Sequence, residues 1–299
     1  MSTKPIIAIM YDFDKTLTDK DQQEYSFIPS LDMTAKEFWT KSDELAKEND
    51  MDKILAYMNL MITQAKKKNV PITRESFRGL GAQVELLPGV KSWFKRINDF
   101  GKQLGVRIEH YIISSGIQEI MEGTAIAKEF KKIYACKFHY NKSGNADWPA
   151  QVVNYTTKTQ FVFRINKGVL DQYDDVKINT FVPHEERRVP YANMIYIGDG
   201  LTDIPCMTVT KQNGGESIAL YHKGGKSKVQ RLLLENRVGY VCEANYSKNT
   251  ELDATIKLLI QKIALEASLR EITMNQKKEI NEIIEQEKFD EHNKKVNKK

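Results

Sequence analysis

Two aspartates lie directly after the first apolar run of the chain. The run Ile6 to Tyr11 is followed by Asp12-Phe13-Asp14. In an open α/β sheet, ligands bind just outside the carboxyl ends of the strands. Two carboxylates two residues apart at such an end can face one crevice, one as a nucleophile and the other as a proton carrier. Taken alone the pattern is short, because two acids at the start of a loop are often only solvated turn residues.

A second acidic cluster follows another apolar run. Ile195-Tyr196-Ile197 leads into Gly198-Asp199-Gly200-Leu201-Thr202-Asp203, and glycine lets the backbone approach a ligand closely. Magnesium prefers hard oxygen ligands in an octahedron, and carboxylates from two different strand ends can supply them. A Gly-Asp-Gly turn without a ligand would suffice if this cluster stood alone.

Two further segments could bind a phosphate. Ser114-Ser115-Gly116 ends the apolar run Ile108 to Ile113. The first amides of a following helix can donate to phosphate oxygens, although such a segment most often merely caps a helix. Lys158 begins a helical pattern, where a fixed ammonium can offset the charge of a nucleophile and a phosphate. Lys167 is half a turn out of phase on the same helix, so we expect only one of the two lysines to face the site.

A sheet must position these side chains. Apolar, β-rich runs alternate mostly with helical patterns, which favours an α/β fold with a mostly parallel sheet and helices on both faces. A hairpin is expected within residues 137–157, around Asn141 to Gly144. The runs are Ile6 to Tyr11, Ile108 to Ile113, Ile133 to Phe138, Met194 to Ile197 and Ser217 to Tyr221.

The segment from Lys20 to Leu87 has several helix signals and no convincing strand. Thr34 and Glu37 fit a capping box. Five apolar residues in this segment recur at helical spacing and form one stripe. The simpler interpretation is that they face the core, although the methionines among them could also line a ligand cavity. The stripe consists of Ile54, Met58, Met61, Ile62 and Ala65.

Three regions follow from these patterns. We expect a catalytic core formed by residues 1–19 and 88–250, an inserted all-helical domain at 20–87, and a C-terminal helix with a charged tail at 251–299. The last dozen residues are expected to fray because they are highly charged.

Composition excludes several classes of protein. Hydrophobic residues make up 41% and charged residues 28%, as in ordinary globular proteins. The net charge is +5, but the 45 basic and 40 acidic residues are interleaved, which argues against nucleic-acid binding. No apolar run is long enough for a membrane span, so no membrane partner and a cytoplasmic location are expected. The oligomeric state is not predicted.

The three cysteines give no metal-binding pattern. Cys136, Cys206 and Cys242 are far apart and form no Cys-x-x-Cys pair. We interpret them as reduced, structural thiols.

The four motifs, in this order, resemble those of the haloacid dehalogenase superfamily of phosphohydrolases, over about Ile6 to Tyr246. The insert after the first motif and the Ser114 to Gly116 segment look like the phosphoserine phosphatase branch. The resemblance implies a Rossmann-like core, a helical cap at 20–87 that closes over the crevice, a Mg²⁺ cofactor and an aspartyl-phosphate intermediate. The implied reaction is hydrolysis of a small phosphate monoester.

The resemblance also implies the chemical roles of the first and last motifs. Asp12 is the nucleophile, and Asp14 is the general acid and base. Asp12, the backbone carbonyl of Asp14 and Asp199 surround the magnesium, and Asp203 supports these ligands through water or by orienting one of them.

The two middle motifs are assigned to the phosphate in the same way. Ser114 binds the transferring phosphoryl group, and Ser115 and Gly116 belong to the same phosphate-binding segment. Lys158 holds the group against Asp12.

Asp14, the second aspartate of the first motif, distinguishes between the enzyme classes of this superfamily. Dehalogenases of this superfamily lack it, and P-type ion pumps have a threonine there and many membrane spans. Phosphotransferases and phosphomutases keep it, so they remain alternatives. A phospholigand-binding protein that has lost turnover is another alternative, since a fold alone does not prove a function.

Two questions stay open. Asp21, Arg74 and Arg78 are candidates for reading a polar leaving group, although ion pairing is the simpler interpretation of the arginines. A nucleic-acid or scaffold role of the charged C-terminal helix is possible as an additional function.

Overall fold

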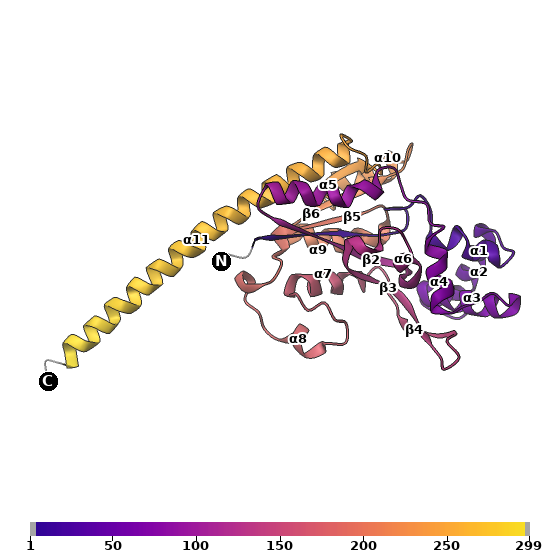
Figure 1. Ribbon diagram of the computed structural model, residues 1–299, viewed down its shortest axis with the longest axis horizontal. Helices are drawn as coiled ribbons and strands as arrows, with labels where there is room; N and C mark the ends of the chain where they lie inside the picture. The colour runs from indigo at the N-terminus through magenta and orange to yellow at the C-terminus, as the bar shows by residue number, and fades with distance from the viewer. Residues whose placement is uncertain (1–3, 297–299) are drawn as a thin grey trace.

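A seven-stranded sheet forms the centre of the computed structural model, which describes residues 4–296 (Figure 1). The strand order is β4-β3-β2-β1-β5-β6-β7, and all neighbours are parallel except β3 with β4. This confirms the predicted α/β class with a mostly parallel, Rossmann-like sheet. The strands are β1 Ile6–Tyr11, β2 Arg107–Ile117, β3 Phe130–Tyr140, β4 Ala146–Gln151, β5 Met194–Gly198, β6 Glu216–Tyr221 and β7 Tyr240–Glu243.

The strand order reverses beside β1. The chain places β2 to β4 on one side of β1 and β5 to β7 on the other. In open α/β sheets the crevice at such a switch point is where ligands bind. Asp12 follows β1 and Asp199 follows β5, so both acidic motifs lie at this point.

Alternate residues of β1 pack into two different cores, as the two-residue period of a strand requires. Ile7 and Ile9 pack with α5 (Val90–Gln103) and α11 (Glu251–Val296), whereas Ala8 and Met10 lie in the core that holds α7 (Lys158–Lys167) and α9 (Ile204–Gln212). Figure 1 shows these pairs of helices on opposite faces of the sheet. Both faces of the strand that precedes Asp12 are therefore buried.

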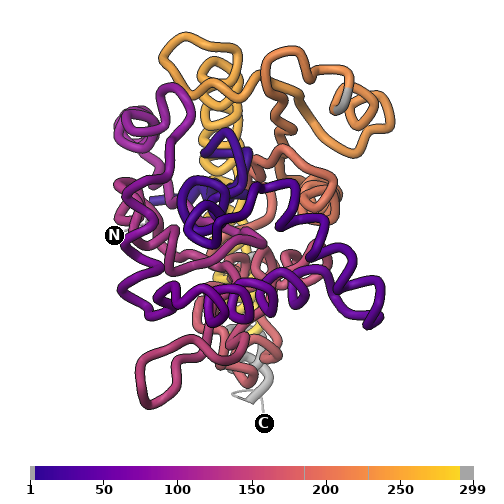
Figure 2. Tube along the Cα trace, turned by 90° about the vertical axis from the view of Figure 1, so that its right-hand side faces the viewer, coloured from indigo at the N-terminus to yellow at the C-terminus, as the bar shows by residue number. Residues whose placement is uncertain are grey.

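The chain between β1 and α5 is helical, with no strand among its described residues. The bridge between Thr18 and Leu86 joins the two segments that lead into and out of it. The capping box of Thr34 and Glu37 forms as predicted. Figure 2 shows these helices in front of the sheet, away from the projecting end of α11. They are α1 Phe27–Ser30, α2 Ala35–Glu48, α3 Lys53–Lys68 and α4 Arg74–Gly81.

The apolar stripe of α3 faces the core. Met58, Met61 and Ala65 are fully buried, so the core-facing interpretation is confirmed.

Some elements differ from the sequence-based expectation. The hairpin of β3 and β4 forms within the expected segment. The strand β7 has no clear sequence signal, because it has only four residues at the sheet edge and only Cys242 among them is buried. β2 continues to Ile117, and the helix after it, α6 (Gln118–Glu122), has only five residues. The remaining helices are α8 Asp175–Asn179 and α10 Lys226–Leu234, besides short 3-10 turns.

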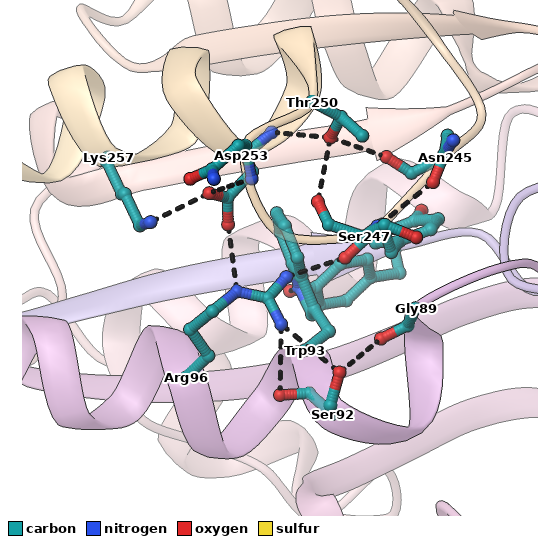
Figure 3. A network of polar contacts seen from close by, with 12 residues as sticks. Gly89, Ser92, Trp93, Arg96, Asn245, Ser247, Thr250, Asp253 and Lys257 are labelled. Carbon is teal, nitrogen blue, oxygen red and sulfur yellow. Dashed lines mark hydrogen bonds and ion pairs between the residues drawn. The ribbon is translucent and has the colours of Figure 1, made fainter.

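A polar network fixes the start of α11 on α5 (Figure 3). Arg96 donates to the Asp253 carboxylate at 2.9 Å and to the Tyr246 carbonyl at 2.6 Å. Lys257 donates to the other oxygen of Asp253 at 2.7 Å. Because Asp253 is almost fully buried, these charge-assisted bonds hold α11 in one place.

The C-terminal helix is longer than expected. Its helical backbone continues to Val296, so the expectation that the last dozen residues fray is wrong for those that the structure describes. Within residues 4–296, no helix is both long enough and apolar enough to be a membrane span. All three cysteines are free and buried, as expected.

Candidate active site

The two aspartates of the first motif leave β1 in different environments. The Asp12 amide donates to the Ile197 carbonyl at 3.0 Å, which continues the pairing of β1 with β5 beyond the strand end. Its side chain is 9% exposed. The Asp14 carboxylate accepts the Gln22 amide at 2.8 Å. The first turn of the insert therefore orients Asp14, whereas the sheet itself orients Asp12.

Lys158, the first residue of α7, lies between two carboxylates. Its ammonium is 3.2 Å from Asp12 Oδ1 and 2.8 Å from Asp203 Oδ1, and it is fully buried. Burial alone would lower the pKa of Lys158, but the charges of Asp12 and Asp203 outweigh it and hold the pKa above its ordinary value. Lys158 is therefore a fixed cation beside Asp12.

The second lysine of α7 lies elsewhere. Lys167 donates to the Ile178 carbonyl at 2.7 Å and to the Thr180 carbonyl. The half turn between the two positions thus puts one lysine beside Asp12 and turns the other toward the end of α8.

Asp203 is held from three sides. Its carboxylate accepts the Lys158 ammonium, the Tyr196 hydroxyl at 2.8 Å and the Gly200 amide at 3.3 Å. A fully buried carboxylate with this many donors has little freedom to move. The arrangement suits a residue that positions its neighbours.

Three carboxylates crowd together at the switch point. Oxygens of Asp12, Asp199 and Asp203 all lie within 4.8 Å of one another. Burial, and then the charges of neighbouring aspartates, raise the pKa of Asp199 to about 8 and that of Asp203 to about 6. One lysine does not neutralise three carboxylates. A hard divalent cation fits this donor set, since Mg²⁺ takes oxygen ligands, and Thr16 Oγ1 orients Asp199 by donating to it at 3.3 Å.

The Asp14 carboxylate lies outside this cluster. Burial, and then the charges of Asp21 and Asp12, raise the pKa of Asp14 well above its ordinary value. A raised pKa favours the protonated carboxyl group, which is the form that a general acid needs.

The loop after Asp14 has a constrained backbone. Lys15 has a φ of 59°, in the left-handed region that is unfavourable for residues other than glycine. Its amide donates to Thr18 Oγ1 at 3.2 Å, and its carbonyl accepts His222 Nε2 at 2.8 Å. Its ammonium pairs with Asp21 at 2.6 Å. The contacts of its amide, carbonyl and ammonium therefore fix this loop, which keeps Asp12 and Asp14 in place.

The end of β2 packs against the first motif. Ser114 is buried, and its Oγ accepts the Gly116 amide at 3.2 Å. The Ser115 hydroxyl is buried without a partner among the described residues. A Cβ on Gly116 would lie 2.6 Å from Asp14 Oδ2 and 1.8 Å from the Gln22 side chain. A side chain at position 116 would therefore displace the Gln22 and Asp14 side chains where this segment packs against the first motif.

The three candidates for recognising the leaving group of the substrate all form ion pairs within the protein. Arg74 lies 3.8 Å from Glu119, and Arg78 lies 2.9 Å from Glu122. Asp21 pairs with Lys15. The contacts of both arginines fit the simpler interpretation, ion pairing between the insert and α6.

Sequence reasoning missed three residues that support the site. Gln22, Tyr196 and His222 contact Asp14, Asp203 and the Lys15 carbonyl, respectively. Tyr196 stands inside the apolar run before the second acidic motif, which was its one visible signal. Gln22 begins a short 3-10 turn eight residues after Asp14, whereas His222 follows β6 and is brought to the site only by the tertiary fold.

Several known proteins are similar to this chain. An uncharacterized protein of Borreliella burgdorferi is 29% identical over 274 residues, which cover 83% of this chain and 94% of that protein. A HAD family hydrolase of Salmonella enterica serovar Typhi has a similar fold, with a TM-score of 0.56 and 15% identity over 86% of this chain and 72% of that chain.

A structure described as a phospho-aspartyl intermediate analogue of phosphoserine phosphatase is also similar. It has a TM-score of 0.52 and 15% identity over 85% of this chain and 99% of that chain. Residues 7–224 match the putative phosphatase family, a range that includes all four motifs. The chain therefore belongs to the putative phosphatase family and has the fold of the haloacid dehalogenase hydrolases, as the order of its motifs predicts.

Proposed function

We propose that the protein is a magnesium-dependent phosphatase that hydrolyses a small phosphate monoester through a phosphoryl group on Asp12. The observation that carries the proposal is the buried ammonium of Lys158, 3.2 Å from Asp12 and 2.8 Å from Asp203, at the switch point of the sheet. A nucleophilic carboxylate must approach a dianionic ester, and a fixed cation beside it offsets their repulsion.

The first step forms a bond between an Asp12 oxygen and phosphorus. The bond from phosphorus to the ester oxygen breaks, and the leaving alkoxide takes the proton of Asp14. The raised pKa of Asp14 supports this assignment, because burial and the nearby acids favour its protonated form. Lys158, with Ser114 and the segment through Ser115 and Gly116, would hold the phosphoryl oxygens.

The second step reverses the role of Asp14. As a carboxylate it takes a proton from water, which attacks phosphorus, and the bond from phosphorus to Asp12 breaks. Phosphate leaves, and Asp12 regains its negative charge. One residue serves as acid and then as base, because both steps pass through the same geometry.

Asp12 and Asp199 would hold the magnesium, with the Asp14 carbonyl as a further ligand, and Asp203 would support them through water or by orienting a ligand. When bound, the cation offsets the charge of the carboxylate and of the phosphate. Asp203 accepts three hydrogen bonds from the protein, so its part is to fix the positions of Lys158 and of the ligands.

The proposed substrate class rests on the similar structures and on the helical insert. Some of the similar structures are phosphoserine phosphatases, and we extend the general substrate type, a small phosphorylated molecule, to this protein. Helices α1 to α4 would form a cap, at residues 20–87, that selects the leaving group and excludes water on closing.

Release of phosphate from an aryl phosphate tests the proposal. We expect turnover that EDTA abolishes and magnesium restores. Asp12→Asn should lower it at least about 10⁴-fold, as loss of a nucleophile does. Asp43→Asn is the matched control, since Asp43 forms an exposed ion pair with Lys53, and it should leave turnover unchanged.

Two results would favour the alternatives. Transfer of phosphate to an added alcohol or sugar without free phosphate would indicate a phosphotransferase or phosphomutase. Saturable binding of phosphorylated ligands without turnover on a broad panel would indicate a binding protein. Equal activity of Asp12→Asn and the natural chain would contradict the assigned nucleophile.

A further inference from the structure

The helix α11 has two parts with different surroundings. Its first part, up to Ala267, packs on the sheet through a buried face. In its second part, every side chain from Glu271 to Phe289 is exposed, and Figure 1 shows this part extending away from the body of the protein. The buried face consists of Leu252, Ile256, Leu259, Ile260, Ile263, Ala264 and Ala267.

The opposite face of α11 carries an apolar stripe along both parts. Successive members from Leu265 to Ile283 are spaced by 4, 3, 4, 4 and 3 residues, which places them on one side of the helix. The six apolar members are between 53% and 69% exposed. We call it the outer stripe: Leu258, Leu265, Leu269, Ile272, Gln276, Ile280 and Ile283.

The spacing of the outer stripe is that of a helix–helix seam. Leu258, Leu265 and Ile272 repeat every seven residues, and the positions from Leu265 onward repeat every eleven. Seven-residue and eleven-residue apolar repeats keep one side of a helix against a partner over a long distance. Most helices in proteins are stabilised by packing of an apolar face, yet this face packs on no other described part of the chain.

We propose that a second copy of this chain covers the outer stripe, so that two α11 helices form a parallel two-stranded coil. In a parallel pair each member lies opposite itself, and all six apolar positions are matched. In an antiparallel pair centred on Gln276, Leu265 would instead face the charged Glu287. Gln276 lies opposite Gln276, where two amides can donate to each other, a device that fixes register.

The arrangement leaves both catalytic bodies free. The buried face of α11 points away from the outer stripe, so each body lies on the outside of the coil. Covering the six apolar side chains on both copies removes on the order of 1,000 Å² of surface, which reaches the lower limit of a specific interface.

Sedimentation analysis of the full chain tests the proposal with a matched pair of variants. Ile272 and Met274 are 53% and 52% exposed and two residues apart, but only Ile272 belongs to the stripe. We expect a dimer for the natural chain, at least about tenfold weaker dimerisation for Ile272→Glu, and no change for Met274→Glu. Phosphate release per chain should stay the same, which checks that both variants are folded.

Cysteine cross-linking tests the orientation. The three native cysteines are buried, so a new surface thiol reports on the helix. Under mild oxidation Ile283→Cys should give a covalent dimer, and Met274→Cys should not. A single-chain mass at every concentration, or a dimer that Ile272→Glu leaves intact, would overturn the proposal. A dimer in which Ile283→Cys forms no disulfide would overturn the parallel arrangement.

Discussion

Two buried polar networks begin at the neighbouring residues Tyr11 and Asp12. The Tyr11 hydroxyl lies 3.0 Å from His110 Nδ1 and accepts Trp93 Nε1 at 2.9 Å, and His110 Nε2 lies 3.0 Å from Asn98 Oδ1. All these groups are neutral, and the Tyr11 hydroxyl, the Trp93 indole nitrogen and both ring nitrogens of His110 have partners. The network of Asp12 contains several carboxylates and one lysine in a small volume.

The two networks differ in what they contribute. Neutral groups that satisfy one another are stable in a buried place. Crowded carboxylates repel one another there, and they persist because the strands and α7 hold them. The charged, incompletely neutralised network is therefore the one that we propose for ligand binding and chemistry, whereas the neutral one serves the fold.

Removing the positive charge of Lys158 from the charged network should have the largest effect on phosphate release. Lys158→Met has a side chain of similar length without the charge that faces Asp12 and Asp203. We expect phosphate release to fall by about 10³-fold, as when a fixed electrostatic group is lost from an active site. The free energy of unfolding should also fall, by about 3 kcal/mol, because two buried carboxylates lose their partner.

Lys167→Met is the matched control for that prediction. Lys167 ends the same helix but donates to the carbonyls of Ile178 and Thr180, at the end of α8, so its replacement should leave turnover unchanged. If Lys158→Met kept turnover within about tenfold of the natural chain, Lys158 would not be the group that holds the phosphoryl oxygens.

The sequence allowed much of the fold and of the charged network to be predicted. The strand Ile6 to Tyr11 and the start of α7 at Lys158 agree with the structure, because apolar periodicity is strong in a sheet buried on both faces. The roles assigned to Asp12, Asp14, Ser114 and Lys158 remain predictions, although the structure places Lys158 3.2 Å from Asp12 and the end of β2 against Asp14.

The parts that escaped prediction depend on long-range contacts. Tyr11 and His110 are 99 residues apart in the chain, and no local pattern links them. β7 is short and lies at the sheet edge, where only one of its four residues is buried. The support from His222 to the Lys15 carbonyl spans 207 residues. Such pairs become visible only when the strands are in register.

Breaking the neutral network at its centre should affect stability and not chemistry. Tyr11→Phe keeps the ring and removes the hydroxyl, which leaves Trp93 Nε1 and His110 Nδ1 without partners. We expect the free energy of unfolding to fall by about 2 kcal/mol, as measured by urea denaturation. Turnover at saturating substrate should stay the same. A large loss of turnover at unchanged stability would show that the two networks are coupled.

The smallest expected effect is the pH dependence that His110 gives to stability. Burial lowers the pKa of His110 to about 3, from an ordinary value of 6.5. The folded state therefore binds the proton less readily than the unfolded state, and stability is lost as the pH falls below about 6.5 toward 3. Between pH 7 and pH 5.5 we expect a loss of about 1.3 kcal/mol from this residue alone.

The variant His110→Phe isolates that loss. The variant is less stable at pH 7, because Tyr11 and Asn98 each lose a hydrogen-bond partner. Its free energy of unfolding should nevertheless fall less than that of the natural chain between pH 7 and pH 5.5, since all other titrating groups are shared. Equal losses in the two proteins would mean that His110 accepts a proton in the folded state, through a rearrangement of the Tyr11 hydroxyl. The neutral network would then rearrange its hydrogen bonds on taking up a proton, whereas Lys158 holds the carboxylates of the charged network in one arrangement.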